Sequence, residues 1–256
     1  MLTSDYCGSF DGTILHYQVN RRVKNPTLLF IHGAGSNHTA WSRILPRFAD
    51  RSYIAVDIRN HGLSGFGRFS IEAVTRDIAE ILHRENVREF IPVGMSIGAP
   101  IALELAKRFP KKAKKAVLIS PFSRSLTRAS GFLIEAMRTL RGLLAFVPMR
   151  RRLKLVTHER LVPAVLSPFN ELKGVHTRDY ARTIERALGS ELDFGAVKQP
   201  TLLITGTKDV FLRRRALADL LWRHPNIVHA DVPTHHLVVT RQPLRTAGLI
   251  AAFAGE

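Results

Sequence analysis

The stretch Glu89-Phe90-Ile91-Pro92-Val93-Gly94-Met95-Ser96-Ile97-Gly98-Ala99-Pro100-Ile101 decides the fold of this 256-residue chain. Its apolar start predicts a strand that ends near Val93, and its last residues begin a helix-like segment. Between them lies the pattern Gly-x-Ser-x-Gly, which places a serine on a sharp turn between a strand and a helix. Gly94 and Gly98 leave room where the strand and the helix pass close together. This context predicts that Ser96 is a nucleophile.

Apolar runs alternate with amphipathic segments on both sides of this turn. The predicted strands are Tyr6–Phe10, Ile14–Val19, Thr27–Ile31, Tyr53–Val56, Phe90–Val93, Ala116–Ile119, Thr201–Ile204 and Ile227–Val232. Most are short and continuously apolar, which is typical of strands covered on both faces. The alternation predicts an α/β fold with a doubly wound, mostly parallel sheet. Asp11-Gly12, between the first two runs, predicts a hairpin and therefore an antiparallel edge.

Apolar residues at helical spacing fill the intervals between the strands, and we interpret them as core-packing stripes. The stripes are Trp41, Ile44, Leu45 and Phe48; Ile71, Val74, Ile78, Ile81 and Leu82; Ala216, Leu217, Leu220 and Leu221; and residues 244–253.

One region, residues 121–192, breaks the alternation, because helical patterns follow one another there without a convincing strand. The first helical stripe consists of Phe132, Leu133, Met137, Leu140 and Leu144, and a second helix is predicted over Thr177–Leu188. We therefore expect residues 1–120 and 193–256 to form the core and residues 121–192 to form a helical cap inserted between two strands. The apolar stripe would either pack on the core or suit an acyl chain.

The chain is strongly basic, with 38 Lys and Arg against 21 Asp and Glu, a net charge of +17 and a pI near 11.0. Such a balance raises nucleic acids, anionic membranes and anionic substrates as partners. The basic residues are spread over separate regions, however, including 111–115, 150–152 and 213–215. No helix-turn-helix or aromatic-interleaved RNA motif accompanies them. We predict a solvated basic surface and no specific nucleic-acid partner, with peripheral contact to an anionic membrane as an alternative.

Other chemistry and other locations find little support in the sequence. No Cys-x-x-Cys, His-Glu-x-x-His or phosphate-loop pattern occurs, so we expect neither a metal nor another cofactor. The single cysteine, Cys7, excludes an internal disulfide and lies far from any catalytic pattern. Because apolar runs stay well short of the roughly 18 residues of a membrane span and the first residues do not resemble a secretory signal, we expect a cytoplasmic location.

A serine hydroxyl needs a general base and a group that orients this base. Asp209 follows the predicted strand at 201–204, on the side where open α/β sheets build their sites. His235 and His236 follow the last predicted strand. Adjacent residues point in different directions, so only one of the two histidines can meet Ser96.

The oxyanion that forms during acyl transfer needs backbone donors. His32-Gly33-Ala34-Gly35 follows a predicted strand, and its small residues would let the N–H of Ala34 approach the reacting oxygen. The N–H of Ile97, directly after the serine, would supply the second donor.

Several of these segments, taken together and in this order, resemble the α/β-hydrolase superfamily along nearly the whole chain. The shared features are His32-Gly33, Asp57-Ile58-Arg59-Asn60-His61-Gly62-Leu63-Ser64, the Gly94–Gly98 turn, Gly206-Thr207-Lys208-Asp209, and His236 with Pro243 seven residues later. The resemblance implies a triad of Ser96, Asp209 and His236. His235 stands where the family usually has glycine. Asp57 ends a strand, and its sequence context suggests a role in stabilising the turn.

This resemblance implies hydrolysis of a small carboxylic ester through an acyl-enzyme on Ser96. A serine nucleophile disfavours the related dehalogenases and epoxide hydrolases, which use aspartate at this position. Three alternatives stay open: a lyase or C–C bond hydrolase acting on an anionic substrate with the same triad, an acyl transferase, and a ligand-binding receptor built on a hydrolase scaffold.

Overall fold

A computed structural model of the chain describes residues 2–22, 26–128, 130–145 and 177–255. Its strands are β1 (Leu2–Gly8), β2 (Ile14–Asn20), β3 (Thr27–Ile31), β4 (Tyr53–Val56), β5 (Phe90–Met95), β6 (Ala116–Ile119), β7 (Thr201–Gly206) and β8 (Ile227–Val232). Its helices are α1 (Ile71–Arg84), α2 (Gly98–Arg108), α3 (Ser130–Ala145), α6 (Thr177–Leu188), α7 (Arg214–Arg223), α8 (Val238–Arg241) and α9 (Pro243–Ala254), with short 3₁₀ turns η1 (His38–Trp41), η2 (Leu45–Phe48) and η4 (Phe194–Ala196).

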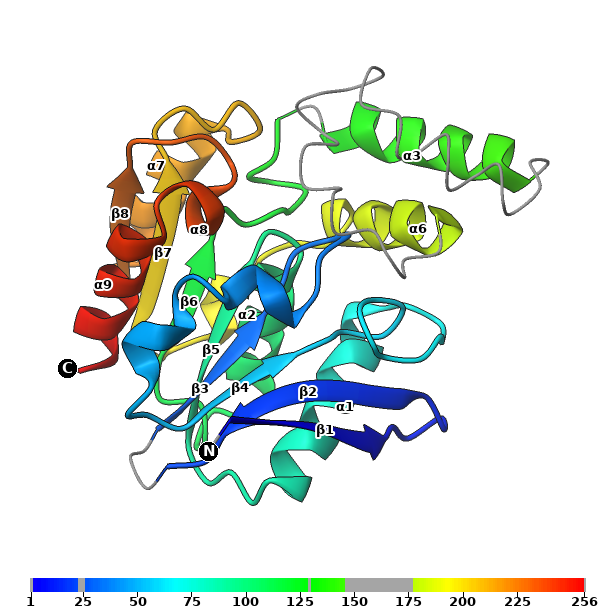
Figure 1. The fold of residues 1–256 in the computed structure, drawn as a ribbon. Coiled ribbons are helices and arrows are strands. Elements are labelled where there is room, and N and C mark those ends of the chain that lie inside the picture. The colour runs from blue at the N-terminus through cyan, green and yellow to red at the C-terminus, as the bar shows by residue number, and fades with distance from the viewer. Residues whose placement is uncertain (1, 23–25, 129, 146–176, 256) are drawn as a thin grey trace.

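The strands form one twisted eight-stranded sheet in the order β1-β2-β4-β3-β5-β6-β7-β8 (Figure 1). From β4 to β8 neighbouring strands are parallel, whereas β1 and β2 pair antiparallel with each other and β2 pairs antiparallel with β4. The α/β fold with a mostly parallel sheet and an antiparallel edge is therefore confirmed. All parallel strands point to the same edge, and their connecting loops gather there.

Helices cover the sheet on both faces, and successive strand residues pack against opposite layers. In β3, Leu29 and Ile31 join one buried cluster with residues of α1, α2 and α7. Leu28 and Phe30 join a second cluster with residues of η1, η2, α8 and α9. This double coverage explains why the central strands read as continuous apolar runs.

Two local expectations need correction. The first strand runs from Leu2 to Gly8 and not to Phe10, because the reversal starts at Ser9, whose N–H donates to Thr13. The stripe that begins at Trp41 is not one α-helix but the two turns η1 and η2. Its four apolar residues are nevertheless buried. The helical spacing therefore predicted their burial correctly, but the prediction of one α-helix was wrong.

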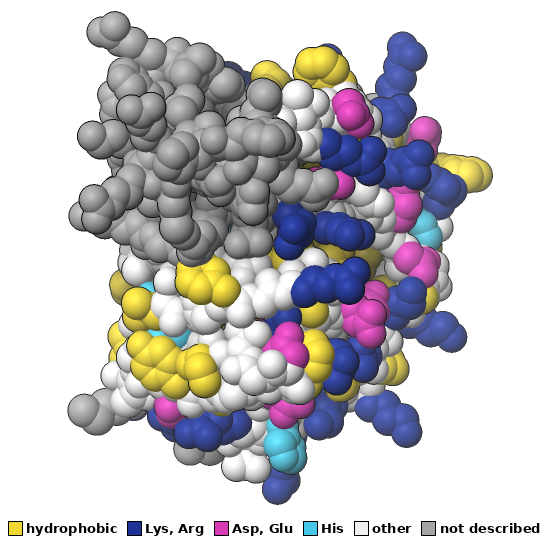
Figure 2. Space-filling view, turned by 90° about the vertical axis from the view of Figure 1, so that its right-hand side faces the viewer, with side chains coloured by type: hydrophobic (Ala, Val, Ile, Leu, Met, Phe, Trp, Pro, Cys, Tyr) yellow, Lys and Arg dark blue, Asp and Glu magenta, His cyan; other side chains and the backbone are white. Residues whose placement is uncertain are grey.

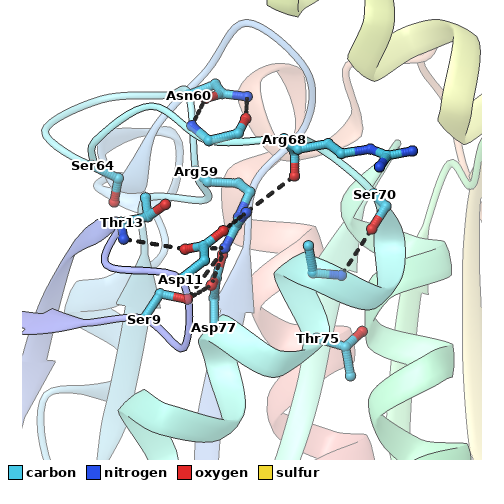
Figure 3. A network of polar contacts seen from close by, with 12 residues as sticks. Ser9, Asp11, Thr13, Arg59, Asn60, Ser64, Arg68, Ser70, Thr75 and Asp77 are labelled. Atoms are coloured by element: carbon cyan, nitrogen blue, oxygen red, sulfur yellow. Dashed lines mark hydrogen bonds and ion pairs between the residues drawn. The ribbon is translucent and has the colours of Figure 1, made fainter.

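An arginine buried beside α1 fixes the loop that follows β4 (Figure 3). The Arg59 Nε and Nη2 atoms donate to the two carboxylate oxygens of Asp77 on α1, both at 2.6 Å. Its Nη1 atom donates to Asp11 in the β1–β2 turn at 2.8 Å and to the Arg68 carbonyl at 3.1 Å. The guanidinium holds the pKa of Asp11 far below its usual range. The loop after β4, the β1–β2 turn and α1 are thereby tied together.

The chain between β6 and β7 carries α3 and α6, which lie side by side at the edge to which the parallel strands point (Figure 1). Arg138 of α3 donates to Glu185 of α6 at 3.0 Å. Phe132 is 75% exposed and does not pack on the core. The structure does not describe the side chains of the other stripe residues, which are Leu133, Met137, Leu140 and Leu144. The division into a core and a cap at 121–192 stays a prediction.

Basic and acidic side chains are interspersed on the face that Figure 2 shows. Lys107 pairs with Asp193 at 3.0 Å, and Lys114 pairs with Glu89 at 2.8 Å. Membrane contact and the absence of a nucleic-acid partner remain predictions. Among the described residues, no helix is long and apolar enough to cross a bilayer.

Candidate active site

Ser96 lies on the turn between β5 and α2 with a φ of 55°, in the left-handed region that non-glycine residues rarely adopt. Neighbouring backbone holds it there. Its N–H donates to the Ile119 carbonyl of β6 at 2.8 Å, and its own carbonyl accepts the N–H of Phe122 at 3.2 Å. The strained turn lifts the hydroxyl out of the sheet and leaves it partly exposed.

The flanking glycines are required by close backbone approach. A Cβ on Gly94 would lie 2.1 Å from the Gly98 carbonyl oxygen, and a Cβ on Gly98 would lie 2.3 Å from the Ile31 carbonyl oxygen. Both distances are well inside van der Waals contact, so any side chain would push α2 off the sheet. Gly33 supplies a similar fit opposite the serine, because its Cβ would lie 3.3 Å from that of Ser96.

The three residues predicted to form a triad meet although they come from three separate loops. The His236 Nε2 atom lies 3.2 Å from Ser96 Oγ. On the other side of the ring, His236 Nδ1 lies 2.8 Å from Asp209 Oδ2. The Asp209 side chain is 3% exposed and that of His236 16% exposed, so the contacts form in a mostly dry environment where electrostatic interactions are strong.

The loops after β7 and β8 bring Asp209 and His236 together. The Lys208 N–H donates to the Thr234 carbonyl at 2.9 Å. A Cβ on Gly206, at the end of β7, would lie 2.3 Å from the His235 carbonyl oxygen. Gly206 therefore has a role that the sequence pattern did not reveal, since it lets the two loops touch.

His235 takes no part in this arrangement. Its side chain is exposed, and its Nδ1 atom lies 3.2 Å from the Lys208 carbonyl oxygen. The structure therefore brings His236, and not His235, to the serine.

Ala34 follows Gly33, which packs close to Ser96, and Ile97 directly follows Ser96 in the chain. Within the described part of the chain, their N–H groups donate to no other backbone group. Gly35 turns the first loop with a φ of 72°. Ile97 directly precedes α2, whose N-terminal end carries partial positive charge. The role of both amides as oxyanion donors stays a prediction.

His32 supports the loop that carries Ala34. Its ring is buried, and its Nδ1–H donates to the Gly33 carbonyl at 2.7 Å while its Nε2 accepts the N–H of Ile58 at 3.2 Å. Burial lowers the pKa of His32 and keeps the imidazole neutral, which suits one donor and one acceptor. His61 packs beside it, and burial lowers its pKa to about 3.

Asp57 holds the other end of the same loop. Its Oδ1 atom accepts both the N–H and the Nδ1–H of His38, at 2.6 and 2.9 Å. Its Oδ2 atom accepts from His16 Nδ1 at 2.7 Å and from the N–H of Leu63 at 2.9 Å. The stabilising role expected for Asp57 in the turn is thus accompanied by a second contact, to the loop that begins at His32.

His16, His38 and Asp57 also have an arrangement that could hold a metal ion. One ligand atom from each lies within 4.8 Å of the others, and this is the group of that kind among the described residues. As the cluster stands, both imidazole Nδ1 atoms bind the carboxylate directly. The outer nitrogen of His16 contacts the Ser4 hydroxyl at 2.5 Å.

We expect Asp57→Asn to lower the free energy of unfolding at pH 7 by about 3 kcal/mol, because an amide cannot accept from donors on both oxygens and a buried partner is left unpaired. Burial raises the pKa of Asp57, but the hydrogen bonds from His16 and His38 outweigh it and hold the pKa far below its usual range. The stabilisation is therefore full above about pH 4, the unfolded value, and is lost as the pH falls below it.

Urea unfolding at pH 7 and pH 3 would measure this effect. Asp219→Asn, at an exposed position of α7, serves as control and should change stability by less than about 0.5 kcal/mol. A difference under about 1 kcal/mol for Asp57→Asn at pH 7, or one that does not shrink in acid, would show that the cluster is not a stabilising centre.

Sequence reasoning missed two aromatic residues of the site. Phe122 and Phe211 both contact the His236 ring, with ring centroids at 4.7 and 5.4 Å. Each follows the end of a predicted strand, and this position at the edge where the site forms was the available signal.

Comparison with known sequences decides the family. Residues 28–249 match the alpha/beta hydrolase family. The chain belongs to this family. The order of Ser96, Asp209 and His236 along the chain is the order in which triad residues follow one another in α/β-hydrolases.

Individual relatives are distant. An uncharacterised protein of Mycobacterium tuberculosis is 32% identical over 98 residues, and the match covers 37% of this chain and only 29% of that protein. An esterase of the same organism is 24% identical over 240 residues, covering 85% of this chain and 79% of the esterase. The crystal structure of a hydrolase from Pseudomonas aeruginosa superposes with a TM-score of 0.81 at 20% identity, covering 99% of both chains. At this identity the likeness in structure shows the fold alone.

Proposed function

We propose that this member of the alpha/beta hydrolase family is a serine esterase that cleaves carboxylic esters through an acyl-enzyme on Ser96. The observation that carries the proposal is the continuous contact from Ser96 Oγ to His236 Nε2 at 3.2 Å and from His236 Nδ1 to Asp209 Oδ2 at 2.8 Å. A nucleophile, a base and an orienting carboxylate in this geometry suit acyl transfer. The similarity to a mycobacterial esterase supports the same reaction class.

In the first half of the reaction, Ser96 Oγ attacks the ester carbonyl carbon while His236 Nε2 takes the hydroxyl proton. Asp209 holds the ring with Nδ1–H towards itself, so that Nε2 is free to accept. The imidazolium then protonates the leaving alcohol as the ester C–O bond breaks. An acyl group remains on Ser96.

The carbonyl oxygen becomes negatively charged during this step and needs donors that are already in place. The N–H groups of Ala34 and Ile97 would supply two hydrogen bonds, and the N-terminal end of α2 adds a favourable field. In the second half, His236 activates a water molecule that attacks the acyl carbon. The acid leaves and Ser96 is restored.

The substrate class that fits is a small ester, with selectivity set by the segment between β6 and β7. A lyase or C–C bond hydrolase acting on an anionic substrate would need a cation beside the serine. Arg138 does not meet this need, because Glu135 and Glu185 engage it. The basic residues at 150–152 lie outside the described residues.

We expect the purified protein to hydrolyse p-nitrophenyl esters, with a rate that depends on acyl length. The measurement is p-nitrophenol release for acyl chains of two, four, eight and twelve carbons, corrected for a blank without enzyme. Turnover of at least one ester with saturation kinetics supports the proposal. If none of the four is cleaved above the blank, the esterase proposal fails and a receptor function on the same scaffold gains support.

A further inference from the structure

Two phenylalanine rings bracket the His236 imidazole. The Phe122 ring lies against it in a tilted arrangement, with a centroid distance of 4.7 Å and an interplanar angle of 31°. The Phe211 ring meets it nearly at right angles, at 5.4 Å and 79°. The two phenyl rings also touch each other, at 5.7 Å and 74°. The imidazole is therefore confined by aromatic contacts in addition to its hydrogen bonds to Ser96 and Asp209.

The backbone of each phenylalanine is tied to another member of the site. The Phe122 N–H donates to the Ser96 carbonyl at 3.2 Å. The Phe211 N–H donates to Asp209 Oδ1 at 3.0 Å, leaving Oδ2 for the histidine. Each phenylalanine is thus anchored through its backbone to Ser96 or Asp209, and these are the two residues that hydrogen-bond to His236.

The segments that carry the two rings are also joined to each other. Thr127 and Leu212 form an isolated antiparallel bridge. The Arg128 N–H donates to the Phe211 carbonyl at 2.6 Å, and the Arg213 N–H donates to the Leu126 carbonyl at 2.8 Å. This pairing fixes the distance between the loops after β6 and β7. The two phenyl rings are consequently carried by backbone segments that are hydrogen-bonded to each other.

The effect of the two phenyl rings on the reaction follows from the positive charge that His236 gains during catalysis. Aromatic faces attract cations, and the attraction grows when water is excluded. Among the described residues that contact the imidazole, Asp209 carries a charge, whereas Ser96 and the two phenyl rings are neutral. His235, the nearest titratable residue in sequence, is exposed and faces the Lys208 carbonyl. The Phe122 face therefore lies where positive charge develops in the transition state.

We propose that Phe122 is a positioning residue for the esterase reaction: its ring holds His236 within reach of Ser96 and stabilises the imidazolium, and Phe211 supports it from the side. The inference rests on the proposed function. It assigns a role in the chemical step to a residue that does not itself react.

Phe122→Leu tests this role, because leucine keeps the site covered but has no aromatic face. We expect kcat for a p-nitrophenyl ester to fall about tenfold. We also expect the acid side of the kcat/KM profile to move to lower pH by about 0.5 unit, because the imidazolium loses its stabilising contact. Phe122→Tyr retains the face and should stay within about twofold and 0.2 unit of the wild type.

Phe194→Leu is the matched control. Phe194 is buried and contacts a different histidine, His224, at 5.7 Å and away from the serine. It should reduce thermal stability and leave the acid side of the profile in place. The proposal is overturned if Phe122→Leu does not move the acid side, or if Phe194→Leu moves it equally.

Nuclear magnetic resonance separates this proposal from the proposed function. The His236 ring signals, assigned with His236→Gln, can be titrated in wild-type protein and in Phe122→Leu without any substrate. A midpoint that falls in Phe122→Leu supports the contact even if no ester is cleaved, in which case only the esterase proposal fails. An unchanged midpoint rejects the role of Phe122 even if the wild type proves to be an active esterase.

Discussion

Ser96→Ala is expected to lower kcat for a p-nitrophenyl ester by about 10⁵- to 10⁶-fold, because it removes the atom that bonds to the acyl carbon. The loss should appear in kcat much more than in KM, since alanine leaves the surrounding walls and the two amides of the oxyanion site in place. Steady-state assays at high enzyme concentration would measure the residual rate. Thermal unfolding checks that the variant folds.

The fold should survive this change. Alanine at φ 55° carries the same backbone strain as serine there, and the N–H bond to the Ile119 carbonyl does not depend on the side chain. We therefore expect unfolding temperatures of the two proteins within a few degrees. A folded Ser96→Ala protein that retains more than one hundredth of the wild-type rate would mean that another residue is the nucleophile.

Asp209→Asn is expected to lower kcat by about 10⁴-fold while leaving the fold intact. The asparagine amide would present N–H groups to His236 Nδ1, which turns the imidazole towards the wrong tautomer. The proton would then sit on Nε2, the atom that must accept from Ser96. Rates at pH 7, measured with the ester that the wild type cleaves best, give the effect directly.

Asp193→Asn is the control for this substitution. Asp193 is exposed and pairs with Lys107 on the far side of the core, so its loss should leave kcat within about twofold. A loss of less than tenfold for Asp209→Asn would show that the carboxylate does not orient the base, and the acid of the site would have to be sought elsewhere.

The sequence was most informative at positions where a physical requirement, such as close backbone approach, allows few residue types. The Gly-x-Ser-x-Gly pattern alone predicted Gly94 and Gly98 as close-contact positions, and a Cβ at either would indeed lie 2.1 to 2.3 Å from a backbone oxygen. Asp209 and the pair His235 and His236 were found because parallel strands all end at one edge, so residues after different strands meet there. The choice of His236 came from the family resemblance.

Other features depend on tertiary contacts that no local pattern reveals. The stripe from Trp41 to Phe48 has helical spacing, yet it forms two short turns, and Pro46 at the start of the second cannot donate a hydrogen bond to a continuous α-helix. Phe122 and Phe211 read as ordinary apolar loop residues, and their contact with His236 depends on a pairing of two loops that lie far apart in the sequence. The role of Gly206 arises in the same way, from the close passage of the loop that contains His235.

The central claim, that Ser96 is the nucleophile, is tested most directly by covalent labelling. Wild-type protein treated with a fluorophosphonate should gain the mass of one phosphonyl group with loss of fluoride. Digestion and peptide mapping should place the group on Ser96, and Ser96→Ala should stay unlabelled under the same conditions. Label found on another residue, or equal labelling of Ser96→Ala, would contradict the account.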